Sequence, residues 1–259
     1  MSFQTLHLAS QPFKTQNKDW SIVASYTIPG KASGLAWDGT YIYFGIYGTN
    51  GDKIYRFNPA NGTNEFLFSN PTINDSYGMS YDGQYLWITD HGTPSSVPAY
   101  ALQLDFSGNI LSQFNLPDHY MSGIAHDSGD FWVATYYPNP GTIYKVNAMG
   151  TILTQFQSPN EQPWDICLQD SNLWVADYNA NKLYKINQTG FMLEDHDCET
   201  QKPAGIVFDG QYLWYVDGPL GANSTLYKVD LEGTGTPQIS VPVTSFNYGV
   251  VTVGDSSVW

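Results

Sequence analysis

The chain has 259 residues, with 24 acidic and 10 basic side chains and a formal net charge of −14. A field of this sign repels phosphate backbones, so nucleic acid is excluded as an expected partner. No apolar run approaches the ~18 residues of a membrane-spanning helix, and we expect no membrane insertion. Aromatic residues make up 15% of the chain and charged residues only 13%. That balance is typical of many short strands.

The chain carries one sequence pattern six times, at a spacing of 40 to 45 residues. Each copy opens on a small or acidic residue, runs through an apolar segment into a tight turn, and continues into a second apolar segment. The copies start near Gly34, Gly78, Gly123, Asp165, Gly205 and Gly249. Self-similarity at a fixed period of this length indicates a repeat architecture.

Each repeat divides into four short strand signals separated by turn residues. In the fourth repeat these signals cover residues 166–168, 172–176, 182–186 and 191–194. Asp-Gly pairs such as Asp82-Gly83 predict a hairpin between the first two strands, because glycine tolerates a positive φ. Asn or Asp followed by Gly, as at Asn147 and Gly150, predicts the turn between the last two strands. Four antiparallel strands per repeat predict one blade of a β-propeller.

Six repeats predict an all-β, six-bladed β-propeller that forms a single domain over residues 1–259. The sixth repeat stops at Trp259 inside its second strand, so we expect a further C-terminal region. Strand signals at residues 4–9 and 21–28 align with the third and fourth strands of the other repeats. We therefore expect residues 1–28 to complete the last blade, which closes the ring and removes its exposed edges.

Residues 173–186, with the sequence LWVADYNANKLYKI, resemble an NHL-type blade. The whole chain is similar to the six-bladed propellers that include glutamine cyclotransferase-like, streptogramin lyase-like and gluconolactonase-like proteins. The resemblance implies a propeller fold and is much less specific for function. Enzymes of these groups use carboxylates or a histidine with a bound metal near the channel mouth. No stretch here matches the Glu-rich signature of the cyclotransferases.

In a propeller, the loops from strand four to the next strand one and from strand two to strand three gather on one face, where we expect ligands to bind. Aromatic residues are frequent at these positions: Tyr47, Tyr77, Tyr120, Tyr136, Trp164, Tyr178 and Tyr248. Tyrosine and tryptophan offer a flat apolar face and a hydrogen-bonding edge, which suits a glycan, a peptide or another small ligand. The alternative is that these rings plug the channel or fill gaps between blades.

A catalytic residue is expected to depart from the repeat. Asp165 replaces the glycine of the other repeats, close to Glu161, while His91 and His119 occur once each near the predicted channel mouth. Asp165 with either histidine could supply an acid–base pair or part of a site for a divalent cation. The alternative is that both histidines are solvated surface residues. No other cofactor is predicted, and no metal ligand is assigned.

Four tryptophans share one repeat position and are predicted to be buried between blades: Trp87, Trp132, Trp174 and Trp214. Cys167 and Cys198 lack the spacing of a zinc site. Two free thiols are the preferred interpretation for them, with a disulfide as the alternative.

The sequence thus favours a binding module for a small-molecule, glycan, peptide or protein partner. A lyase-like or cyclotransferase-like enzyme and a protein–protein scaffold are the alternatives. The composition favours an extracellular or cell-envelope location although the first residues show no signal-peptide pattern, and a cytoplasmic location stays open.

Overall fold

The structure is a computed structural model that describes residues 20–46, 52–73, 76–91, 99–199, 202–218 and 223–233. The strand signals at residues 4–9 and in the sixth repeat, together with Tyr47 and Tyr248, lie outside these residues. Within this part of the chain, no helix is long and apolar enough to cross a membrane.

The strands form five four-stranded antiparallel sheets, each of which is one blade. Blade 1 consists of β2 (Ala32–Trp37), β3 (Ile42–Ile46), β4 (Asp52–Asn58) and β5 (Thr63–Asn70). Blade 2 consists of β6 (Ser76–Tyr81), β7 (Leu86–Asp90), β8 (Tyr100–Leu104) and β9 (Ile110–Asn115). Blade 3 consists of β10 (Met121–Asp127), β11 (Asp130–Thr135), β12 (Thr142–Asn147) and β13 (Ile152–Gln157). Blade 4 consists of β14 (Pro163–Gln169), β15 (Asn172–Asp177), β16 (Lys182–Asn187) and β17 (Met192–Asp197). Blade 5 consists of β18 (Pro203–Phe208), β19 (Leu213–Asp217), β20 (Asn223–Asp230) and β1 (Ser21–Pro29).

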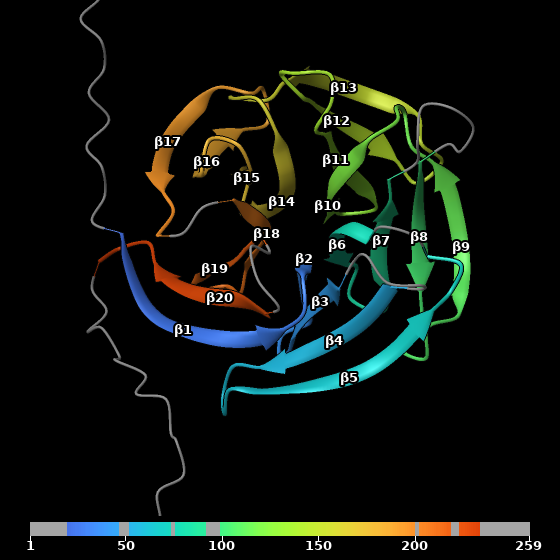
Figure 1. The fold of residues 1–259 in the computed structure, drawn as a ribbon. Helices are drawn as coiled ribbons and strands as arrows, with labels where there is room; N and C mark the ends of the chain where they lie inside the picture. Colours follow the sequence, from blue (N-terminus) through green and yellow to red (C-terminus); the bar gives the residue numbers. More distant parts are fainter. Residues whose placement is uncertain are drawn as a thin grey trace, which may run out of the picture.

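The five blades surround one central axis (Figure 1). The innermost strands β2, β6, β10, β14 and β18 each pack against the next, and β18 packs back against β2. The ring is therefore closed with five blades, and the predicted count of six is wrong.

The error came from the assignment of β1. This strand is the outermost strand of a blade, as predicted, but it pairs with β20, from Ser21 opposite Asp230 to Pro29 opposite Asn223. The fifth repeat supplies only three strands up to its last described residue, so its edge at β20 is open to pairing. β1 covers that edge and closes the ring without the sixth repeat.

The turns form as the sequence predicts. Gly83 has a φ of 98°, and the Oδ1 atom of Asp82 accepts hydrogen bonds from the amides of Gln84 and Tyr85 at 2.8 and 2.7 Å. The turns between the third and fourth strands also use glycines with positive φ, such as Gly150 at 80°. These local bonds fix the register of each hairpin.

The core lies between blades and not within one blade. The four repeated tryptophans are buried, with at most 6% of each residue exposed, which confirms the prediction. Each indole Nε1 donates to an acceptor in the hairpin of its own blade, for example from Trp87 to Asp82 at 2.7 Å and from Trp174 to Gln169 at 2.9 Å. Tyr43 takes this position in blade 1 and donates to Asp38 at 2.7 Å. The repeat thus specifies both the packing and the polar partner of each interface.

The innermost strands approach one another closely where they begin. A Cβ atom on Gly34 would lie 2.8 Å from the backbone of Gly78, and one on Gly123 would lie 2.7 Å from the amide nitrogen of Ile166. No residue with a side chain can therefore replace these glycines without displacing the neighbouring backbone. We call the end of the ring where the innermost strands begin the upper face, and the end where they finish the lower face.

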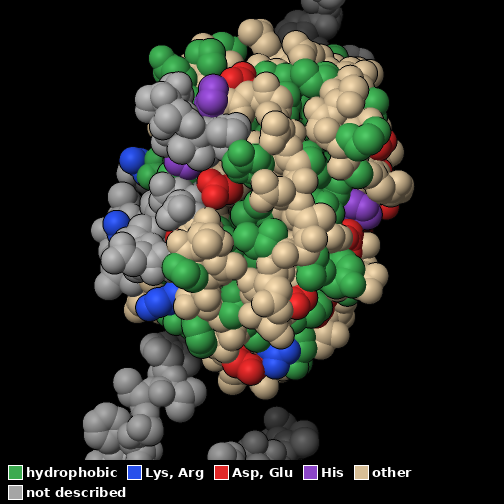
Figure 2. Space-filling model, turned by 90° about the vertical axis from the view of Figure 1, so that its right-hand side faces the viewer, with side chains coloured by type: hydrophobic (Ala, Val, Ile, Leu, Met, Phe, Trp, Pro, Cys, Tyr) green, Lys and Arg blue, Asp and Glu red, His purple; other side chains and the backbone are tan. Residues whose placement is uncertain are grey.

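The side of the ring around blade 2 shows no single-sign patch (Figure 2). Acidic and basic side chains are scattered among uncharged ones on this face. The negative net charge is thus not concentrated on this flank.

Candidate functional site

The upper face brings together six side chains from blades 2, 3 and 4, which we call the upper cluster. Its members are Tyr77, His91, Tyr120, Tyr136, Trp164 and Tyr178. Each comes from the start of an innermost strand or the end of a second strand. Antiparallel topology places these two positions at the same edge of every blade. The cluster therefore contains all the predicted ligand-binding aromatics that lie in the described residues.

Trp164 is the centre of the upper cluster. Its ring stacks on Tyr178 with centroids 4.4 Å apart, and Tyr77 meets it edge-on at 4.9 Å. Tyr136 lies 5.1 Å away. Edge-on and offset contacts of this kind are the favoured geometries of aromatic pairs. The tyrosines and Trp164 are only partly buried, so the cluster has surface that solvent reaches.

Four side-chain polar atoms in the cluster or on the residues next to its members are buried without a hydrogen-bond partner in the described residues. They are the Nε1 atom of Trp164, the Nδ1 atom of His119, the Oγ atom of Ser76 and the Oδ1 atom of Asp165. A buried polar group without a partner costs about 1–3 kcal/mol. A charged group also lies nearby, since the Lys202 Nζ atom is 4.9 Å above the ring of Tyr178.

Asp165 is not a solvent-exposed acid of the upper cluster. It is fully buried, and its Oδ2 atom accepts hydrogen bonds from the amides of Leu35 and Ile206 at 3.2 and 3.0 Å. Burial raises the pKa of Asp165 well above its usual value, while backbone hydrogen bonds, led by that of Ile206, oppose the shift. This carboxylate joins blades 1 and 5 to blade 4 across the axis, where the other repeats have glycine.

The predicted acid–base pair is not assembled. No hydrogen bond of Asp165 goes to a histidine among the described residues, and His91, at 8% exposure, packs against the rings of Tyr77 and Tyr136. Glu161 is exposed on the loop before β14. The described part of the chain also holds no group of three or more His, Cys, Asp or Glu side chains placed to bind a metal ion.

Asp177, at the end of the second strand of blade 4, bonds to the backbone of its own blade. Asp177 accepts from the amides of Gln162, Asn179 and Ala180 at 2.8 to 3.1 Å. Burial, with a smaller effect of the nearby Glu161 charge, raises the pKa of Asp177. The two cysteines, Cys167 and Cys198, are both free thiols in the structure.

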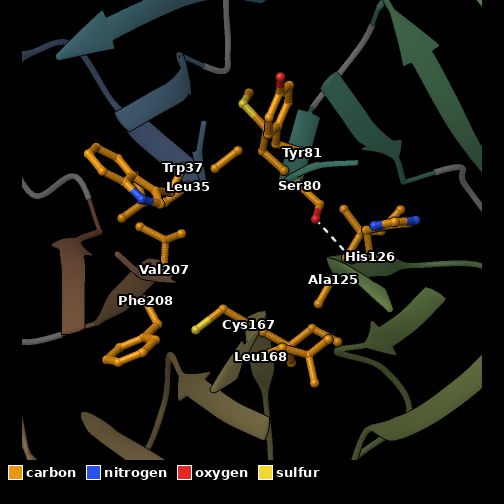
Figure 3. A pocket seen from close by; sticks show the side chains of 14 residues that line it. Leu35, Trp37, Ser80, Tyr81, Ala125, His126, Cys167, Leu168, Val207 and Phe208 are labelled. Carbon is orange, nitrogen blue, oxygen red and sulfur yellow. Dashed lines mark hydrogen bonds between the residues drawn. The ribbon is translucent and has the colours of Figure 1, made fainter. Parts of the chain in front are cut away.

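The lower end of the axis holds a pocket of about 140 Å³, which we call the axial pocket (Figure 3). Small side chains at one repeat position line it: Ala36, Ser80, Ala125, Cys167 and Val207. Larger ones at the next position form its rim: Trp37, Tyr81, His126, Leu168 and Phe208. The sequence reasoning missed this pocket. The signal was present, since small residues recur at a position that points toward the axis.

No protein-family model matches the chain, and no curated protein matches it. Several solved structures do. Glutaminyl cyclase from Myxococcus xanthus matches with a TM-score of 0.62 and 10% identity, over 82% of this chain and 96% of its own. The pyrroloquinoline quinone-bound aldose sugar dehydrogenase from Streptomyces coelicolor matches with a TM-score of 0.54 and 11% identity, over 82% and 97%. A chain of the nidogen/laminin complex matches with a TM-score of 0.51 and 19% identity, over 73% of each chain.

Fold and comparisons agree on the class: the protein is a β-propeller with four-stranded antiparallel blades. The described ring has five of them. The resemblance inferred from the sequence is thus confirmed at the level of fold. The matching structures include enzymes and a complex of binding proteins, so the likeness does not choose between catalysis and binding.

Proposed function

We propose that this protein is a binding module whose upper cluster holds an uncharged polar ligand with a flat apolar face, of the saccharide or peptide class. The support is that the rings of the cluster pack closely while buried nitrogen atoms in and beside it have no hydrogen-bond partner in the described residues. Trp164 contacts three rings yet leaves its indole Nε1 without a partner, and His119 Nδ1 is in the same state. A ligand that stacks on exposed ring surface and offers hydroxyl or amide groups satisfies both needs once the side chains that cover these two atoms move aside.

The electrostatics of the site support an uncharged ligand. The chain carries a net charge of −14, which disfavours anions, and Lys202 beside Tyr178 is a local cation that disfavours basic ligands. An enzymatic alternative has less support, because the described residues of the site contain no converging carboxylate and histidine pair.

The test is a pair of glycan and peptide arrays probed with the wild-type protein and with Trp164→Ala. We expect the wild type to retain a set of related array members. Trp164→Ala should lose at least tenfold in affinity for them, since large buried aromatics carry much of the binding energy at such sites. Phe191→Ala is the control, because Phe191 is 67% exposed in the turn between β16 and β17 on the lower face.

The proposal is contradicted if neither array retains the wild type. It is equally contradicted if Trp164→Ala and Phe191→Ala bind as tightly as the wild type. A thermal melt of each variant shows that a loss of binding does not come from unfolding.

A further inference from the structure

The axial pocket has the size and lining of a small-molecule site. Its volume of about 140 Å³ is close to the ~150 Å³ apolar cavity that accommodates a benzene-sized molecule. All five blades contribute to its walls, so its shape depends only on the closed ring (Figure 3). It opens on the lower face, at the opposite end of the axis from the upper cluster.

The lining discriminates against charge. No Asp, Glu, Lys or Arg lines the pocket, and most of its side chains are apolar or aromatic. A charged ligand would lose hydration there without meeting a counter-ion. An uncharged aromatic ring meets Trp37, Tyr81 and Phe208 at the rim.

Backbone donors face the axis as well. An innermost strand has no strand partner on its axial side, so alternate amides along it point inward. The amides of Leu35 and Ile206 do so near the upper end, where they reach Asp165. Two positions further down, the amide of His126 donates to the Ser80 Oγ atom of the preceding blade at 2.9 Å.

In the other four blades, the acceptor position that Ser80 fills holds no oxygen atom. The position that precedes the amide of Phe208 holds Cys167, whose sulfur is only a weak acceptor. In the other three blades, the equivalent acceptor positions hold Ala36, Ala125 and Val207, whose side chains have no acceptor atom. By the equivalence of the repeats, the amides that follow in the next blade point to the pocket without a side-chain acceptor. They belong to Tyr81, Leu168 and Trp37.

We propose that the axial pocket binds a small, uncharged aromatic molecule that carries a hydrogen-bond acceptor, such as an aryl ketone or an aryl ether. The ring lies against the apolar side chains of the lining, and the acceptor oxygen meets one of the inward amides of Tyr81, Leu168 and Trp37. This site is independent of the upper cluster.

Three probes of similar shape test the proposal by calorimetric titration: acetophenone, ethylbenzene and benzoate. Acetophenone should bind about five- to tenfold more tightly than ethylbenzene, the usual effect of one neutral hydrogen bond. Benzoate should bind most weakly, because its charge has no counter-ion. Absence of acetophenone binding up to its solubility limit overturns the site, and equal affinity for acetophenone and ethylbenzene overturns the role of the amides.

Two variants locate the binding. Ala125→Leu fills the pocket and should weaken acetophenone and ethylbenzene at least tenfold. The triple variant Ala36→Ser, Ala125→Ser and Val207→Thr supplies all three amides with acceptors of the kind that Ser80 provides, and should remove the preference for acetophenone while ethylbenzene affinity changes less than twofold. Trp164→Ala on the upper face should change neither. Unchanged affinity for both probes in Ala125→Leu, or an unchanged preference for acetophenone in the triple variant, overturns the proposal, and the triple variant decides it if Ala125→Leu does not fold.

Discussion

The blade interfaces and the upper cluster are both rich in aromatic rings, but they differ in what happens to the polar atoms. At the interfaces, Trp87, Trp132, Trp174 and Trp214 each donate an indole hydrogen bond to the hairpin of their own blade. In the upper cluster, Trp164 is surrounded by rings and its Nε1 has no partner in the described chain. The interface pattern recurs in every blade and is satisfied, as stability requires. The upper cluster occurs once and is not satisfied, as a site awaiting a ligand would be.

Removal of β1 should have the largest effect, because it opens the ring at one interface. Tyr26 on β1 packs against Phe57 of blade 1 and Trp214 of blade 5, at centroid distances of 4.8 and 6.0 Å. We expect a variant lacking residues 1–29 to lose its single cooperative unfolding transition, measured by circular dichroism in urea. A synthetic peptide of residues 20–29 added in trans should restore part of it. An unchanged melting curve without the peptide would show that β1 does not close the ring.

Truncation of an interface tryptophan should have the next largest effect. Trp174→Ala removes a fully buried ring and leaves the Gln169 side chain without its donor. The expected loss in the free energy of unfolding is ~3–5 kcal/mol. Trp164→Ala should lose less than half as much, because its ring is partly exposed and its nitrogen has no bond to lose. Equal losses in urea melts would remove the distinction between the two regions.

Asp165 is an intermediate case, since it occurs once and yet is bonded to the interfaces. Asp165→Gly restores the repeat but leaves the buried amides of Leu35 and Ile206 without their acceptor, at an expected cost of ~1–3 kcal/mol. Asp165→Asn keeps an acceptor oxygen and removes the charge, so it should be more stable than the wild type at neutral pH.

The pH dependence of these variants gives a second measurement. The folded pKa of Asp165 is raised above its unfolded value of about 3.9. Its stabilising contribution is therefore fully present below that pH and is lost as the pH rises toward the folded pKa. We expect Asp165→Asn to gain stability relative to the wild type from about pH 4 upward. Parallel profiles for the two proteins would show that Asp165 is not protonated more readily in the folded state.

These cases explain how much the sequence could predict. The blades, their turns and the buried tryptophans follow from local chemistry that repeats, such as the bonds around Asp82 and Gly83. The number of blades does not follow from it, because that number depends on which open strand edge β1 pairs with, and the structure shows that it pairs with β20. The grouping of the aromatic residues was predicted, because position within the repeat placed Tyr77, Trp164 and Tyr178 together. The buried bonds of Asp165 were not, because they cross between blades and leave no local pattern.

The smallest expected effect comes from replacing a tryptophan by phenylalanine, and it compares the blade interfaces directly with the upper cluster. This change removes the indole nitrogen and some ring area in both regions. At Trp174 it also leaves the Gln169 acceptor without its donor, so we expect a loss of ~2–4 kcal/mol in the free energy of unfolding. At Trp164 the same change removes a buried donor that had no partner, and this relief offsets the lost ring area. Trp164→Phe should thus stay within ~1 kcal/mol of the wild type in urea melts. If it is as costly as Trp174→Phe, then the indole of Trp164 is bonded in solution and the upper cluster is a structural plug.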